Sequence, residues 1–160
     1  MTIDPGVTGT GIAIWNSYKG IPCNKIPIFT NSIIIRGKES WRKKIEDYTQ
    51  VICSYMNLYS PCNHIYIEEP IFMESAKGLA SARSDSLEKL ISCASYFAGY
   101  FSAVNRKVEF VRIIDWKGTM PKDVTERRIR KVIENDNICE GIHNHAWDAV
   151  GIGLYLQKLL

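Results

Sequence analysis

The sequence predicts an α/β fold in which a five-stranded mixed sheet carries helices on both faces. Two observations lead to this prediction. Residues 1–37 hold three short segments that are rich in β-branched side chains and joined by short turns, a pattern typical of a three-strand antiparallel meander. Helical and strand-like segments alternate after this region, which favours two further, parallel strands with helices packed over both faces.

The first half of the chain holds the meander, one helix and a fourth strand. The meander strands are expected over residues 1–6, 10–15 and 26–37. Residues 40–61 predict a helix, because Ser40 suits an N-cap, apolar residues recur at helical spacing, and Pro61 ends the pattern. The segment HIYIEEP, residues 64–70, predicts a short apolar strand that ends in two acids and a proline.

The second half predicts three helices and one strand, with boundaries at residues 84–105 (helix), 107–114 (strand), 121–136 (helix) and 144–160 (helix). The first of these helices is apolar almost all round in its middle, so we expect it to be buried. Pro121 suits a first helical turn, and Asn144 suits an N-cap. Residues 72–84 have weak periodicity and are expected to be a mobile loop. Because no linker or repeat interrupts this order, residues 1–160 predict one domain.

Composition excludes several classes of protein. Hydrophobic residues make up 46% and charged residues 23%, the balance of a soluble globular protein, and no apolar run has the length of a membrane span. The five cysteines are widely spaced without a Cys-x-x-Cys pair, which argues against a disulfide scaffold or a zinc ribbon and predicts reduced thiols inside a cell. The net charge of +3 is small, but residues 117–131 concentrate Lys and Arg.

Acids and a histidine stand at three separated element ends. Asp4 ends the first strand, Glu68 and Glu69 end the fourth, and His145 and Asp148 begin the last helix. The last two point the same way, because residues i and i+3 share a helical face. Hard divalent cations prefer carboxylate oxygens, and two such ions can clamp the attacking and leaving oxygens of a phosphodiester. The predicted metal ligands are Asp4, Glu68, His145 and Asp148, around two Mg²⁺ or Mn²⁺ ions.

Each of these elements also has an ordinary structural interpretation. An Asp before Pro-Gly is commonly a turn residue, and a pair of Glu residues at a strand end is commonly a solvated edge. A His and an Asp in a first helical turn can simply cap the helix and complement its dipole. Adjacent strand residues face opposite sides, so only one of Glu68 and Glu69 can reach a common site. The joint occurrence of the three elements, rather than any single one, favours the metal site.

Three motifs together resemble a known family. IDPGVTGTGIAIW, IYIEEPIFM and HAWDAVGIGLYL are similar, in order and spacing over almost the whole chain, to the signature regions of RuvC-type Holliday-junction resolvases in the RNase H-like superfamily. The resemblance implies an RNase H-like fold, with Asp4 as the bridging carboxylate and Glu68, rather than Glu69, as the acid of the fourth strand. It implies a crossover junction endodeoxyribonuclease that works as a homodimer on four-way junctions.

The resemblance extends to residues that contact DNA. The segment DWKGTMPK resembles the basic segment of such resolvases, and Lys117 and Lys122 resemble the lysines near the scissile phosphate, so they join the four metal ligands as expected catalytic residues. His145 occupies a position that is Asp or His in the family. Phe72 resembles an aromatic residue that inserts near the junction centre. The expected DNA-contacting residues are Phe72, Lys77, Arg83, Lys117, Lys122, Arg127, Arg128 and Lys131. Because the chain is short, divergent and contains cysteines, it suggests a phage or viral branch, acting in the cytoplasm of a bacterium or an infected host cell.

Other functions fit part of the pattern. An RNase H-like nuclease that cuts flaps, forks or RNA–DNA hybrids would use the same metal ligands, and a non-catalytic DNA-binding module would keep only the fold. ATPases of the actin and chaperone type also begin with an Asp-x-Gly-Thr-like loop, but their fold repeats this topology twice and the chain holds one copy. The sequence therefore favours a nuclease for branched DNA and leaves its cleavage preference open.

Overall fold

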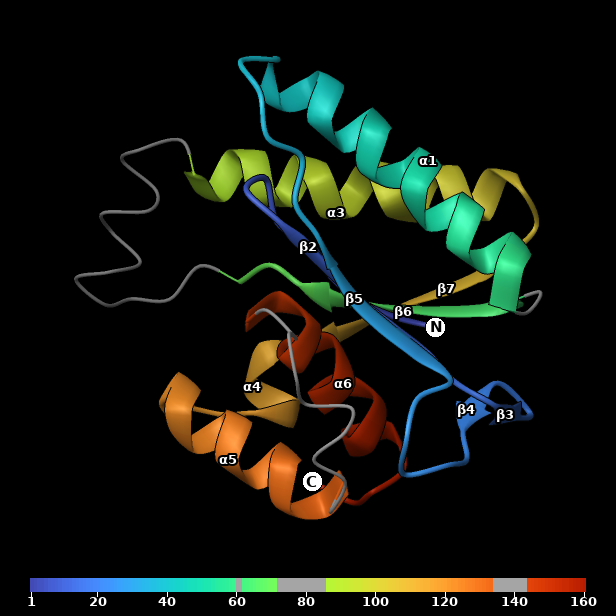
Figure 1. Cartoon of the computed structure of the whole chain (residues 1–160), viewed down its shortest axis with the longest axis vertical. Coiled ribbons are helices and arrows are strands. Elements are labelled where there is room, and N and C mark those ends of the chain that lie inside the picture. The colour runs from blue at the N-terminus through green and yellow to red at the C-terminus, as the bar shows by residue number, and fades with distance from the viewer. Residues whose placement is uncertain (60–61, 72–85, 134–143) are drawn as a thin grey trace.

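The computed structural model describes residues 1–59, 62–71, 86–133 and 144–160. A twisted sheet runs through the middle of the molecule, with α1 and α3 on one side and α4, α5 and α6 on the other (Figure 1). The expected α/β architecture, a mixed sheet with helices on both faces, is confirmed. The expectation for residues 72–84 lies outside the described residues.

The sheet has five strands in the order β5-β2-β1-β6-β7. Their bounds are Thr2–Asp4 (β1), Thr10–Ile14 (β2), Phe29–Ile33 (β5), His64–Glu69 (β6) and Lys107–Arg112 (β7). β1 and β5 both pair antiparallel with β2, which confirms the meander, while β6 runs parallel to β1 and β7 parallel to β6. Ile3 lies opposite Ile67 across β1 and β6, so the next residues, Asp4 and Glu68, reach the same edge of the sheet.

Two connections differ from the sequence expectation. A small hairpin, β3 (Ser17–Tyr18) and β4 (Ile21–Pro22), replaces the plain connection between the second and third strands. Its turn residues Lys19 and Gly20 both have positive φ, as tight hairpins require. The expected strand 107–114 stops at Arg112, because the chain turns into the short helix α4, Ile113–Trp116. The sequence did not indicate this turn, because Ile113 and Ile114 have a high β propensity and extend the strand pattern.

The helices α1 (Trp41–Tyr59) and α3 (Ser86–Ala103) cover one face with large apolar side chains. The core beneath them combines strand isoleucines with helix residues, among them Ile3, Ile12, Ile65, Ile67, Ile45, Tyr48, Ile52, Phe97 and Phe101. The expectation that α3 is buried almost all round is wrong. Tyr96 and Tyr100 are 43% and 40% exposed, because only one stripe of the helix meets the sheet and α1.

The opposite face carries α5 (Lys122–Ile133) and α6 (Asn144–Leu156), and α6 is buried without interruption from Ala146 to Leu154. α6 comes close to the sheet through glycine. A Cβ on Gly11 of β2 would collide with the backbone carbonyl of His145, and a Cβ on Gly151 or Gly153 would collide with a tryptophan ring. This close approach places the first turn of α6 beside the end of β1.

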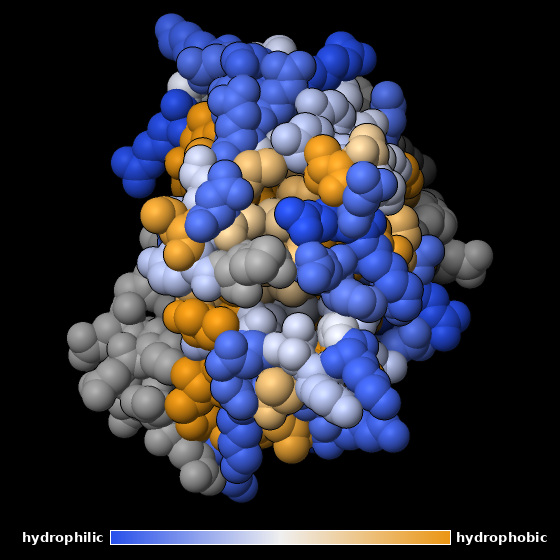
Figure 2. Space-filling view, turned by 90° about the vertical axis from the view of Figure 1, so that its right-hand side faces the viewer, coloured by the Kyte–Doolittle hydropathy of each residue, from blue (hydrophilic) through white to orange (hydrophobic). Residues whose placement is uncertain are grey.

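The surface is mixed in character. In Figure 2 hydrophilic side chains predominate, and hydrophobic ones form separate groups. No helix among the described residues is long and apolar enough to cross a bilayer. Four cysteines in the described part of the chain are free thiols: Cys23, Cys53, Cys62 and Cys93.

Candidate active site

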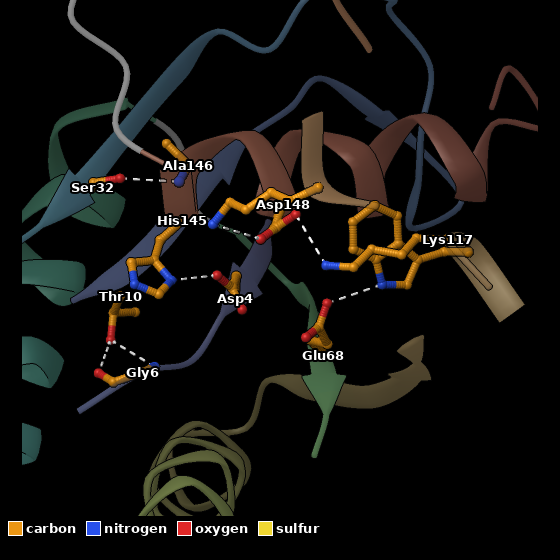
Figure 3. Close-up of polar contacts among 11 residues, drawn as sticks. Asp4, Gly6, Thr10, Ser32, Glu68, Lys117, His145, Ala146 and Asp148 are labelled. Carbon is orange, nitrogen blue, oxygen red and sulfur yellow. Dashed lines mark hydrogen bonds and ion pairs between the residues drawn. The ribbon is translucent and has the colours of Figure 1, made fainter. Parts of the chain in front are cut away.

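The edge of the sheet where β1 and β6 end opens into a cavity of about 590 Å³. Its lining includes all four predicted metal ligands: Asp4, Glu68, His145 and Asp148. The parallel register of β1 and β6 brings in the first two, and one face of the first turn of α6 brings in the others. Figure 3 shows their side chains directed toward one another from these three elements.

Asp4 and His145 form the tightest polar contact of the cavity. His145 Nδ1 lies 2.7 Å from Asp4 Oδ2, and Asp4 is buried. Burial raises the pKa of Asp4, and the hydrogen bond to His145 opposes part of that rise. The same hydrogen bond raises the pKa of His145, which favours an imidazolium that donates to a carboxylate. The two shifts tie the protonation of the histidine to that of the buried acid.

Glu68 is the acid of β6 that belongs to the cavity. Its Oε2 accepts a hydrogen bond of 3.0 Å from Trp116 Nε1. Burial, and then repulsion from Asp4, raise the pKa of Glu68 to about 8. Glu69 lies opposite Arg112 of β7 and is not among the described residues that line the cavity. The alternation of strand side chains thus separates the two acids as expected.

Asp148 is held by two lysines. Lys117 Nζ lies 3.3 Å from its Oδ1 and Lys122 Nζ lies 3.8 Å from its Oδ2. The Lys117 side chain is 16% exposed and its ammonium lies 4.9 Å from the centre of the Trp116 ring, a cation–π contact. The Lys122 side chain is 47% exposed. One lysine therefore pairs with Asp148 from a largely buried position, and the other reaches the same acid from solvent.

Comparison with known proteins identifies the fold. No protein-family model matches the sequence, and no curated protein sequence matches it. The structure of T. thermophilus RuvC in complex with Holliday junction substrate aligns with a TM-score of 0.62 at 12% identity, over 95% of this chain and 88% of that one. A second Thermus thermophilus RuvC structure aligns with a TM-score of 0.58 at 13% identity, over 95% and 89%. The chain has a RuvC-like fold. This confirms the RNase H-like prediction made from the three motifs.

A RuvC-like fold raises the question of a divalent metal. Among the described residues, no three His, Cys, Asp or Glu side chains are arranged to hold an ion as they stand. The acids are engaged instead with His145, with Trp116 and with the two lysines. The donor chemistry nevertheless fits Mg²⁺ or Mn²⁺, because three carboxylates line one cavity and two of them, Asp4 and Asp148, are buried. Burial first, and then repulsion between the acids, raises the pKa of Asp4 and of Glu68.

Several features of this cavity were not expected from the sequence. Trp116 is one, and the apolar wall made by Pro5, Val7, Trp41 and Leu90 is another. The hydroxyl of Ser32 on β5 accepts a 3.0 Å hydrogen bond from the Ala146 N–H and so fixes the start of α6. The sequence predicted a role for Lys117 but none for its neighbour Trp116. Nothing local in the sequence indicates that α4 brings Trp116 against Glu68 of β6.

The remaining predicted DNA contacts lie apart from the cavity. Arg127, Arg128 and Lys131 are exposed on α5, on the side opposite its buried residues Thr125 and Ile129. Arg127 also pairs with Asp123 of the same helix at 3.8 Å. The expectations for Phe72, Lys77 and Arg83 lie outside the described residues. In the described part of the RuvC-like fold, Lys117 and Lys122 are the predicted DNA contacts that adjoin the acids.

Proposed function

We propose that this protein is a metal-dependent endonuclease that cleaves branched DNA, with four-way junctions as its main substrate. One observation carries the proposal: Asp4, Glu68, His145 and Asp148 line a single cavity at the strand ends of a RuvC-like fold. One of the structures with this fold is of a RuvC bound to a Holliday junction. The activity would be that of a crossover junction endodeoxyribonuclease.

Each residue of the site has a proposed role in binding metal or in stabilising charge. Asp4 and Glu68 would hold one Mg²⁺ or Mn²⁺, and Asp4, His145 and Asp148 the other. When bound, the ions supply an activated water and stabilise charge on the reacting phosphate, so that cleavage leaves 5′-phosphate and 3′-hydroxyl ends. Lys117 and Lys122 pair with Asp148 in this structure, and both ammonium groups would be available to the phosphate oxygens if that acid held a metal instead.

A symmetric junction calls for two active sites, so the proposal includes a two-fold homodimer. The outer face of α3 supports it, because residues 91–104 contain no charged side chain and several of them are exposed: Ile91, Ser95, Tyr96, Gly99, Tyr100 and Val104. Light scattering of Tyr100→Arg against the wild type tests this face. We expect a dimer for the wild type and a monomer for the variant, and a monomeric wild type would contradict the dimer.

The compartment and the origin of the protein are also part of the proposal. The four free thiols support a reducing compartment, such as the cytoplasm of a bacterium or of an infected host cell. A phage or viral origin fits the short, divergent chain.

The decisive experiment compares Asp4→Asn and Asp148→Asn with the wild type on a synthetic four-way junction in Mg²⁺. We expect both variants to bind the junction and to lose cleavage, because each loses a carboxylate that a metal needs. Undiminished cleavage by either variant would refute the metal-site assignment. Asp123→Asn, on the exposed side of α5, is the matched control and should cleave normally.

The alternatives predict different substrate profiles. Rates on a four-way junction, a fork, a flap, an RNA–DNA hybrid and linear duplex would separate them. A junction preference supports the proposal, and faster cleavage of the hybrid supports an RNase H-like enzyme. Junction binding without Mg²⁺-dependent cleavage of any branched DNA would indicate a non-catalytic module.

A further inference from the structure

The indole of Trp116 joins the site to the helix beneath it. The side chain is 3% exposed and packs with Tyr66 of β6, Val111 of β7 and Ile152 of α6. A Cβ on Gly151 would collide with its ring, so the indole occupies the space that this glycine leaves open. Its orientation is therefore fixed by packing from three elements.

This fixed orientation determines where the indole N–H points. A buried indole N–H needs an acceptor, and Glu68 Oε2 at 3.0 Å is that acceptor. The Glu68 carboxylate is also repelled by Asp4 in the same cavity. The hydrogen bond opposes that repulsion by engaging one carboxylate oxygen, and it leaves the other oxygen unengaged by the indole.

We propose that Trp116 is a positioning residue, which holds the Glu68 carboxylate in the orientation that a divalent metal uses. The inference rests on the proposed function, because it concerns the same metal ligands. A group that hydrogen-bonds to a metal ligand restricts the rotation of that ligand, so the side chain loses less conformational entropy when the ion binds. The ring of Trp116 also lies 4.9 Å from the ammonium of Lys117, so one side chain contacts both Glu68 and the lysine that pairs with Asp148.

The molecule contains a matched control for this role. Trp15 is 4% exposed, donates a 3.0 Å hydrogen bond from Nε1 to Thr2 Oγ1, and occupies the space beside Gly153 on the same helix. Its acceptor is a neutral hydroxyl, which itself donates to the Ala149 carbonyl at 2.7 Å. Burial, hydrogen-bond length and helix are thus alike, and the acceptor is what differs.

The test compares Trp116→Phe with Trp15→Phe. The midpoint temperature of thermal unfolding should fall in both variants, since each loses a buried hydrogen bond and some packing. Mn²⁺ affinity, measured by titration calorimetry without DNA, should fall about 10-fold or more in Trp116→Phe and stay within about 2-fold of wild type in Trp15→Phe. Wild-type affinity in Trp116→Phe, or equal losses in both variants, would overturn the inference.

A double-mutant cycle separates positioning from general damage. In a Glu68→Gln background, Trp116→Phe should cause no further loss of Mn²⁺ affinity, because the ligand it orients is already gone. A loss as large as in the wild-type background would overturn the inference. If the wild-type protein itself binds no Mn²⁺, the proposed function fails and the inference falls with it. If the wild type binds and Trp116→Phe binds equally well, the inference alone fails.

A measurement on the wild-type protein needs no variant to fold. The four tryptophans give four indole N–H signals in a ¹⁵N-edited NMR spectrum. Addition of Mg²⁺ should move the Trp116 signal, because its acceptor becomes a metal ligand, and should leave the Trp15 signal in place. A Trp116 signal that does not move at saturating Mg²⁺ would overturn the inference.

Discussion

The two faces of the sheet are packed by opposite means. Over one face, α1 and α3 interlock with the strands through large side chains such as Tyr48, Phe97 and Phe101. Over the other face, α6 approaches the strands through Gly11, and tryptophan rings lie against two of its own glycines. The first arrangement gains stability from buried apolar area, and the second fixes position. His145 and Asp148 of the polar site lie on α6, on this second face, where close packing determines the position of the backbone.

The largest expected effect comes from the apolar face. Phe101→Ala removes a fully buried ring from α3 and should lower the free energy of unfolding by about 3–5 kcal/mol. Junction cleavage per folded molecule should stay near wild type, because Phe101 does not line the cavity. Urea unfolding and cleavage at low temperature measure the two quantities. Normal stability with lost cleavage would contradict the view that this face supplies stability while the α6 face positions the site.

A smaller effect on stability, but a larger one on activity, is expected from Gly11→Ala. The added Cβ meets the His145 carbonyl, so the start of α6 must move, at a cost of about 1–3 kcal/mol. Cleavage should fall with it, since His145 and Asp148 move together. The control is Gly99→Ala on α3, where a Cβ meets nothing within 4 Å and where alanine should maintain or raise stability. Wild-type cleavage by Gly11→Ala would show that the close approach is not needed.

A pH dependence of stability is the prediction with the smallest change per step, and it is centred on Glu68. The pKa of Glu68 is about 8 in the folded protein and ordinary when unfolded, so between these values the folded state holds the extra proton. Without metal, the free energy of unfolding should therefore fall as pH rises toward 8, by at most about 1.4 kcal/mol per pH unit. Glu68→Gln should remove this contribution to the slope.

The apolar face supplies the control for that measurement. Burial raises the pKa of Cys93 to about 12, so this thiol is neutral in the folded state and mostly neutral in the unfolded state below pH 8, and Cys93→Ala should leave the slope nearly unchanged. Chemical denaturation at pH 5 to 8 compares the three proteins. A slope that persists in Glu68→Gln would assign the effect to other groups, such as the Asp4–His145 pair.

The fold was predictable because its signals are local. Apolar periodicity located the five strands of the main sheet and the helices α1, α3, α5 and α6, and short connections indicated the meander. The convergence of Asp4, Glu68, His145 and Asp148 was expected from their joint occurrence at three element ends and from the resemblance of the three motifs. In the structure, the parallel pairing of β1 with β6 and the shared helical face of i and i+3 positions account for it. What these acids do chemically stays a prediction.

Other features depend on contacts between distant segments. The exposed side of α3 escaped prediction, because an uncharged helix face looks the same whether it is covered or free. The role of Trp116 escaped because α4 is one turn long, and its contact with Glu68 joins residues 48 positions apart. Residues on α5 were expected near DNA for their charge, but periodicity alone places Arg127, Arg128 and Lys131 on its outer side.

The contact between Asp4 and His145 spans 141 positions in the chain, and this distance bears on the order of events during synthesis. Strands β1, β2 and β5 leave the ribosome first and can pair early, because their contacts are short in sequence. The half of the site on α6 arrives last, after the remaining strands. A growing chain therefore carries Asp4 and Glu68 without His145 and Asp148. A chain without α6 would hold only part of the acid set, so the set that lines the cavity would be complete only after α6 has packed on the sheet.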